Sequence, residues 1–116
     1  MSNVFVVSGI IKKVQISEPK SAGKGASAII LVRYGVERES TGNQVDFVNA
    51  VLIRIPSFKF PKIRDDVKVG RHVDITGHLQ GVVKNIMSEA FVTTELVADR
   101  VDFKDNTGTV TVQSDS

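Results

Sequence analysis

The sequence contains no cysteine and no tryptophan, and only three prolines and two histidines occur among its 116 residues. Without cysteine, neither a disulfide nor a thiolate metal site can form. No apolar run approaches the roughly 18 residues of a membrane-spanning helix. The first residues lack the basic region and the cleavage site of a signal peptide. We therefore expect a cytoplasmic protein with no membrane association.

The charge balance is only slightly basic. The formal net charge is +2, charged residues make up 24% of the chain and hydrophobic residues 41%, which is typical of a soluble globular protein. Residues 1–104 carry all 15 basic residues and 11 of the 13 acidic ones, a formal charge of +4. That excess permits contact with phosphates through a local patch without demanding it. We expect one domain over 1–104 and a flexible polar tail over 105–116.

Little in the sequence supports catalysis or metal binding. His72 and His78 lie six residues apart on one predicted strand, which separates them by about 20 Å, so one metal ion cannot bind both. Asp65 and Asp66 have no neighbouring His or Cys and are typical of a solvated turn. The glycines form no phosphate-binding loop, and no serine has a partnered base nearby. We expect no catalytic residue, metal, cofactor or small-molecule substrate.

Five stretches rich in Val, Ile and Phe are separated by turn-forming residues, and no window has a helical period. The predicted strands are Val4–Val14, Ala26–Val36, Gln44–Ile55, Arg71–Gln80 and Phe91–Asp102. Gly9 predicts a bulge or a bend in the first strand, and Gly77 interrupts the fourth. Thr41-Gly42-Asn43 predicts a hairpin turn, and Gly81–Ala90 a loop. The chain is therefore expected to be mainly β.

The segment Pro56–Arg71 contains two prolines, which exclude a strand through it. Pro61 could start a short helical turn that ends near Val67. This is the element order of an all-β OB-fold: three strands, a short helical or irregular connector, and two more strands. This five-stranded Greek-key barrel commonly binds oligonucleotides or oligosaccharides. A small SH3-like barrel is the alternative that strand order alone leaves open.

The third predicted strand is apolar on both faces. Alternation places Phe47, Asn49, Val51 and Ile53 on one face and Val48, Ala50, Leu52 and Arg54 on the other. A half-buried strand usually turns a polar face to water. A second face with an aromatic ring and an amide, closed by a basic residue, could instead be a stacking platform for unpaired bases. The alternative is a strand covered on both sides by protein, through a second layer or a subunit partner.

The connector interleaves aromatic rings and lysines. Phe58, Lys59, Phe60 and Lys62 fall within six residues, so they could supply base stacking and phosphate contact together. Alternatively, each ring could plug the open end of the barrel, and the lysines would then be solvated flanks.

In order and spacing, several segments resemble the bacterial single-stranded DNA-binding protein family. They are Asn3–Gly9, Thr41-Gly42 ahead of Phe47–Ile53, Val69–Leu79 and Thr93–Ala98, and the resemblance spans roughly Asn3 to Phe103. It implies an OB-fold that binds single-stranded DNA without sequence preference, in DNA replication, recombination or repair. It also implies a homo-oligomer, a tetramer or a dimer. An apolar edge strand at Asn3–Val7 independently favours at least a dimer.

The resemblance assigns roles to individual residues. Phe47 matches a stacking tryptophan, Asn49 and Ile53 share its face, and Ile53 stands where the family has a phenylalanine. Tyr34 is the aromatic nearest the family's second-strand stacking position, and Lys84 is the only cation of the expected loop after the fourth strand. The connector departs from the family, which usually has a longer helix there. We expect Tyr34 and Phe47, and also the connector rings Phe58 and Phe60, to stack bases. The residues expected to neutralise phosphates are Arg33, Arg54, Lys59, Lys62 and Lys84.

The C-terminal residues depart from the family. Val112–Ser116 has neither the acidic run nor the apolar tip that recruits replication and repair enzymes. The primosomal replication protein B relatives share a compact OB-fold without that tail. The alternative function is therefore a primosome-like OB-fold assembly protein, whose apolar outer face pairs with protein and whose nucleic-acid contact is vestigial.

Overall fold

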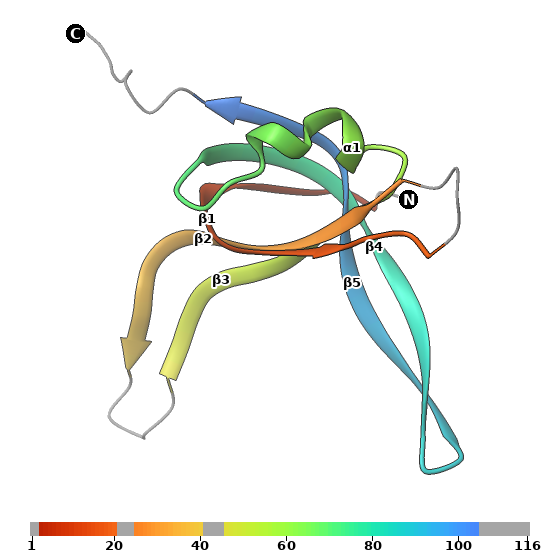
Figure 1. The fold of residues 1–116 in the computed structure, drawn as a ribbon. Helices are drawn as coiled ribbons and strands as arrows, with labels where there is room; N and C mark the ends of the chain where they lie inside the picture. Colours follow the sequence, from red (N-terminus) through yellow and green to blue (C-terminus); the bar gives the residue numbers. More distant parts are fainter. Residues whose placement is uncertain (1–2, 21–24, 41–45, 105–116) are drawn as a thin grey trace, which may run out of the picture.

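The structure, a computed structural model, describes residues 3–20, 25–40 and 46–104, apart from the side chains of 36–40 and 46–48. The strands are β1 (Phe5–Ser17), β2 (Ser27–Ser40), β3 (Asp46–Ile55), β4 (His72–Ile86) and β5 (Glu89–Lys104). Between β3 and β4 lie the short helix α1 (Phe60–Ile63) and a 3₁₀ turn, Arg64–Asp66. Figure 1 shows the strands wrapped into a barrel, with α1 over one end. The expected tail, 105–116, lies outside the described residues.

The strands close into a barrel in the order β1-β2-β3-β5-β4. β1 pairs with β4 over Phe5–Ile10 and with β2 over Ile10–Ser17, so one long strand serves two neighbours. All of these pairings are antiparallel except that of β3 with β5, which is parallel and joins Ile53 to Leu96 and Arg54 to Val97. The expected five-stranded OB-fold, with a short helical connector after the third strand, is confirmed.

The core consists of aliphatic side chains that alternate along the strands. Alternation with a period of two brings every second side chain to the inside of the barrel. The fully buried strand residues include Ile11, Ile30, Val32, Ile53, Ile55, Val73 and Ile75. The ring of Phe60 enters the same cluster from α1. The barrel interior is therefore a packed core, and any ligand must bind on its outer surface.

Gly9 and Gly77 stand where two strands approach too closely for a side chain. A Cβ atom on Gly9 would lie 2.1 Å from the carbonyl oxygen of Arg33, and one on Gly77 would lie 2.0 Å from that of Val97. The β4–β5 register also shifts between Thr76 and Gly77. The sequence predicts a bulge or bend at Gly9 and an interruption at Gly77, and in the structure each glycine marks a place where two strands approach closely. The one at Gly9 lies where β1 changes its pairing partner from β4 to β2.

The prediction of a loop over Gly81–Ala90 is wrong, because β4 and β5 continue as a hairpin beyond the barrel. Ile86 pairs with Glu89, and only Met87 and Ser88 form the turn. Their φ angles are 51° and 68°, as in the type I′ turn whose twist suits a hairpin. The Asn-Gly signal typical of that turn is missing. Figure 1 shows this hairpin and the β2–β3 hairpin projecting on the side away from α1.

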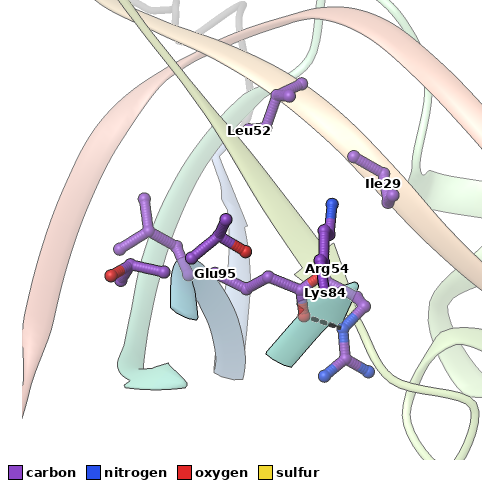
Figure 2. A pocket seen from close by; sticks show the side chains of 8 residues that line it. Ile29, Leu52, Arg54, Lys84 and Glu95 are labelled. Carbon is purple, nitrogen blue, oxygen red and sulfur yellow. Dashed lines mark hydrogen bonds and ion pairs between the residues drawn. The ribbon is translucent and has the colours of Figure 1, made fainter. Parts of the chain in front are cut away.

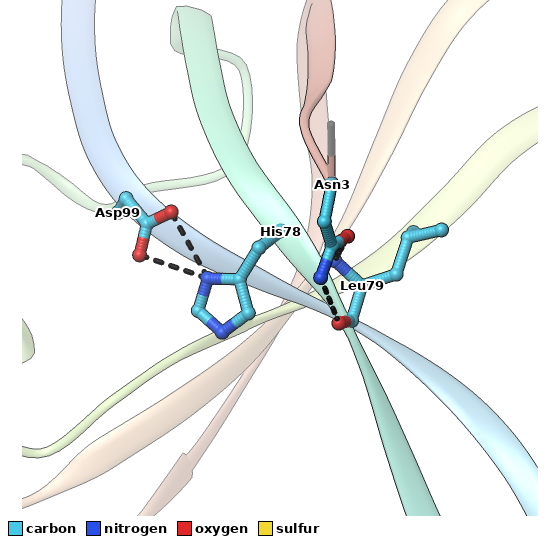
Figure 3. Close-up of polar contacts among 4 residues, drawn as sticks. All are labelled: Asn3, His78, Leu79 and Asp99. Atoms are coloured by element: carbon cyan, nitrogen blue, oxygen red, sulfur yellow. Dashed lines mark hydrogen bonds and ion pairs between the residues drawn. The ribbon is translucent and has the colours of Figure 1, made fainter. Parts of the chain in front are cut away.

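The side chain of Asn3 extends the β1–β4 ladder by one step (Figure 3). Its Nδ2 atom donates to the carbonyl oxygen of Leu79 at 3.0 Å, and the Leu79 N–H donates to Oδ1 at 2.9 Å. Because Phe5 pairs with Gly77, Asn3 faces Leu79 in the same register. An amide side chain thus replaces the backbone of a strand residue at Asn3, just ahead of β1.

Asp74 ties three neighbouring strands together. Its Oδ1 atom accepts a hydrogen bond from the Ser8 hydroxyl of β1 at 2.6 Å, and its Oδ2 atom lies 3.1 Å from the ammonium of Lys104 on β5. The Ser8 hydrogen bond holds the pKa of Asp74 below its usual value. Partial desolvation raises this pKa, and the nearby Lys104 ammonium lowers it.

Candidate nucleic-acid interface

Two adjoining cavities form one groove on the outer face of the barrel. They hold about 300 and 400 Å³, and both are bordered by Ile29 and Leu52. The first is also lined by Arg54, Lys84, Thr93, Thr94, Glu95 and Leu96, and the second by Lys13, Val14, Gln15 and Leu31. The groove thus crosses β1, β2 and β3 and ends against the β4–β5 hairpin. Figure 2 shows its hairpin end.

Strand alternation explains why the groove floor is apolar. On β2 the even-numbered Ala28, Ile30 and Val32 are buried, so Ile29 and Leu31 point outward. In the register, Leu31 pairs with Leu52 of β3, and directly opposed residues of antiparallel strands lie on the same face. Leu52 is 62% exposed. A stripe of aliphatic side chains therefore lies open to solvent along the groove.

Cations border this stripe. Lys13 of β1 pairs with Leu31, and Arg54 of β3 pairs with Ile29, so each cation lies beside a floor residue on the same face. Lys84 reaches the groove from the hairpin. A groove bordered by positive charge can follow the phosphate backbone of an unpaired strand.

The hairpin adds an aromatic ring that the sequence reading missed. Phe91 pairs directly with Lys84 across the hairpin and is 45% exposed. Both side chains therefore lie on one face of the hairpin, the face through which Lys84 lines the groove. The sequence signal was present, since Phe91 is seven residues from Lys84, but the loop expected over Gly81–Ala90 concealed the pairing.

The predicted outer face of β3 is wrong over its second half. Ile53 is fully buried and Val51 packs against the core, whereas Leu52 is exposed and Arg54 is partly exposed. Ile53 therefore cannot contact a ligand. Both faces of this strand are apolar, so alternation alone could not show which one would face the interior of the closed barrel.

Asn49 is partly buried, and its side chain packs against Gly35 of β2, within 3.4 to 3.5 Å of where a Cβ atom would be. Phe47 pairs with Glu39 in the β2–β3 register. The side chain of Phe47 lies outside the described part of the structure. Its stacking role stays a prediction.

On β2, Arg33 and Tyr34 lie beyond the floor residues. Arg33 pairs with Ala50 and is on the same outer face as Leu31, and its Nε atom is buried with no hydrogen-bond partner among the described residues. Tyr34 is 48% exposed and follows Arg33, so alternation turns it to the other face of β2. Tyr34 lines neither cavity.

The connector residues lie apart from the groove. The prediction that Phe60 stacks a base is wrong, because its ring is fully buried and closes the end of the barrel. The guanidinium of Arg64 covers that ring, 5.8 Å from its centroid. Phe58 is 68% exposed. Lys59 is partly exposed and Lys62 is exposed, but none of these three residues lines either cavity.

The described residues offer neither a metal-binding cluster nor a membrane-spanning helix. No group of three or more His, Cys, Asp or Glu side chains there could hold a metal ion. No helix in the same part of the chain is long and apolar enough to cross a membrane.

No model of a known protein family matches the sequence, and no curated protein matches it either. Solved structures do match over nearly their whole length. The P. falciparum SSB in complex with ssDNA shares 16% identity, with a TM-score of 0.61 over 90% of this chain and 96% of that one. The small single-stranded DNA-binding protein of Streptomyces coelicolor shares 12%, with a TM-score of 0.57 over 90% and 96%. The mitochondrial single-stranded DNA-binding protein of S. cerevisiae shares 13%, with a TM-score of 0.57 over 87% and 93%. At these identities the likeness shows that the chain has the OB-fold of these proteins.

Proposed function

We propose that this protein binds single-stranded DNA in the groove that crosses β1, β2 and β3 and ends against the β4–β5 hairpin. The observation that carries the proposal is the exposed aliphatic floor bordered by Lys13, Arg54 and Lys84. Apolar contact suits every base, and the cations suit the phosphates, so binding is independent of sequence. The likeness to solved single-stranded DNA-binding proteins supports the same conclusion. The setting would be DNA replication, recombination or repair, and the proposed activity is binding alone.

Titration of a labelled oligothymidine at several salt concentrations tests this function. Each phosphate that a cation neutralises contributes about −0.7 to the slope of log affinity against log salt for a single strand. Three groove cations therefore set an upper limit of about −2 on the slope, reached only if each of them neutralises one phosphate. Duplex DNA of equal length should bind much more weakly, because its bases are stacked inside the helix.

A matched pair of lysine variants localises the interaction. Lys84→Gln removes a groove cation and should weaken binding and make the salt slope shallower by about 0.7. Lys68→Gln removes an exposed lysine that lines neither cavity, so it should leave binding unchanged. Equal effects of the two variants would mean that only net charge matters.

Stacking is tested at the two aromatic positions. Phe91→Ala and Phe47→Ala should each weaken binding by roughly 1 to 3 kcal/mol if the ring stacks a base. Phe91 is the better founded of the two, since its exposure and its pairing with Lys84 are described. A variant that binds normally has a ring that does not touch DNA.

We also propose a homo-oligomer, a dimer or a tetramer, that forms along the first half of β1. Val4 and Val6 are 66% and 70% exposed. Within the described residues, Phe5–Gly9 pairs with β4 on one side only. An unpaired apolar edge favours pairing with another strand. Sedimentation of a stable monomer at micromolar concentration would contradict this assembly.

The same exposed edge favours the alternative of an OB-fold assembly protein. In that case the groove would contact protein, and the titration would show no DNA binding or equal binding of single strands and duplex. The DNA titration and the sedimentation experiment together distinguish the two functions.

A further inference from the structure

The groove contains one carboxylate among its cations. The Glu95 side chain of β5 accepts a hydrogen bond from Nε of Arg54 on β3, at 3.1 Å. Figure 2 shows the two side chains pointing toward one another across the groove wall. Their exposed fractions are 37% for Arg54 and 33% for Glu95. The pair is therefore open to solvent and to a ligand in the groove.

This ion pair distinguishes Arg54 from the other groove cations. Among the described residues, neither Lys13 nor Lys84 has a carboxylate partner, and Glu95 is the one acidic residue that lines either cavity. In the free protein the Arg54 guanidinium thus already has an anionic partner. A phosphate that reaches this end of the groove meets an arginine that is shared with an anion.

A guanidinium holds its five N–H donors within one small plane. A phosphate bound to any of them would lie only a few ångströms from the Glu95 carboxylate, since that carboxylate already contacts Nε. Two anions at such a distance repel one another, and the interaction is weakly screened because it is shorter than the Debye length of about 8 Å at physiological salt. The phosphate must displace Glu95 or accept its repulsion.

We propose that Glu95 competes with DNA phosphate for Arg54 and so lowers the affinity of the groove. This inference rests on the proposed function. Glu95 makes the wild-type protein release a strand faster than its cations alone would allow. It also makes binding less sensitive to salt, because a phosphate at Arg54 replaces an existing ion pair.

The test is the substitution Glu95→Gln, which removes the charge and keeps the size and the oxygen acceptor. Oligothymidine should bind roughly two- to fivefold more tightly, the factor that corresponds to an exposed ion pair. The salt slope should become steeper by up to about 0.7, one further phosphate contact. Stopped-flow displacement should show slower release. The melting temperature should stay near the wild-type value.

Asp102→Asn is the matched control. Asp102 also lies on β5 and pairs with an arginine, Arg100, at 2.9 Å, but neither residue lines the groove. This variant changes net charge by the same amount and should bind DNA as the wild type does. Equal tightening in the two variants would overturn the proposal, because net charge alone would then explain the effect.

The background variant Arg54→Gln tests whether Glu95 acts through Arg54. Without the arginine, the gain from Glu95→Gln should shrink, since phosphate is no longer drawn to this position. An unchanged gain overturns the competition, and so does weaker binding by Glu95→Gln alone, which would mean that Glu95 positions Arg54. If neither the wild type nor any variant binds, the proposed function itself has failed. If the wild type binds and Glu95→Gln does not improve it, only the role of Glu95 has failed.

Discussion

Leu52 and Ile53 are neighbours in sequence but lie on opposite sides of the barrel wall. Leu52 is 62% exposed in the groove, whereas Ile53 is fully buried in the core. Replacing each with alanine should therefore separate DNA binding from folding. Ile53→Ala should destabilise the protein and leave the groove surface intact, and Leu52→Ala should do the reverse.

The size of each effect follows from the packing. In the register Ile53 stands between Ile30 of β2 and Leu96 of β5. Because β3 is hydrogen-bonded on both sides, it cannot move inward to fill the cavity that Ile53→Ala would leave. We expect a loss of about 3 kcal/mol, within the range for buried Ile→Ala changes. For a domain of about 100 residues that lowers the melting temperature by roughly 12 to 24 °C. Leu52→Ala should change stability by no more than about 0.5 kcal/mol. The lost apolar contact should weaken binding by about 1 kcal/mol, roughly fivefold.

Thermal melting by circular dichroism and oligothymidine titration measure both effects on the same samples. The titration must be run well below the melting temperature of Ile53→Ala, so that every variant is folded. The reasoning is refuted if Leu52→Ala melts early and binds normally while Ile53→Ala melts normally and binds poorly. That result would restore the outer face first predicted for β3.

Three further predictions concern the rest of the barrel. Phe60→Ala should destabilise by about 3 to 5 kcal/mol because its ring is buried, and Phe58→Ala, at an exposed ring, should stay within about 0.5 kcal/mol, both measured by urea denaturation. Gly77→Ala should destabilise strongly, since a Cβ atom there would lie 2.0 Å from a carbonyl oxygen; a melting temperature near the wild-type value would show that β5 can move aside. The hydrogen bond from Ser8 lowers the pKa of Asp74 in the folded protein. The ionised Asp74 therefore stabilises the fold fully above the ordinary Asp pKa of about 3.9, and this stabilisation is lost as the pH falls through the lowered pKa. Asp74→Asn should remove that part of the acid dependence in melting curves recorded between about pH 2 and pH 6, and an unchanged acid dependence would contradict the assignment.

Strand order was predictable because turn-forming residues and aliphatic runs alternate along the chain. Gly9 and Gly77 also marked the places where strands approach closely. The hairpin beyond the barrel was not predictable from turn signals, because Met87 and Ser88 are poor residues for positive φ. Their conformation is imposed by the pairing of the two strands that they join.

The candidate site was predictable in kind but only partly in position. Arg54 and Lys84 line the groove, and the sequence predicts both as phosphate contacts. Ile53 was misplaced because a strand with two apolar faces gives no sign of which face will point into the barrel. That choice depends on the direction in which the whole sheet closes, which involves strands distant in sequence. The floor residues Ile29, Leu31 and Leu52 were missed because aliphatic side chains on a strand are ordinarily taken for core.

The barrel is closed by its shortest ladder, the parallel join of Ile53 with Leu96 and of Arg54 with Val97. Parallel pairing is slightly less stable per residue than antiparallel pairing, and this join links segments more than forty residues apart, so it carries a loop-closure cost that the hairpins avoid. The barrel would therefore open first at this join by local unfolding, and the amides of the join would exchange with solvent ahead of those in the other ladders. Arg54 of β3 and Leu96 of β5 both border the groove. A ligand that contacted both residues would span the join on the outer surface, and its binding would stabilise the closed barrel.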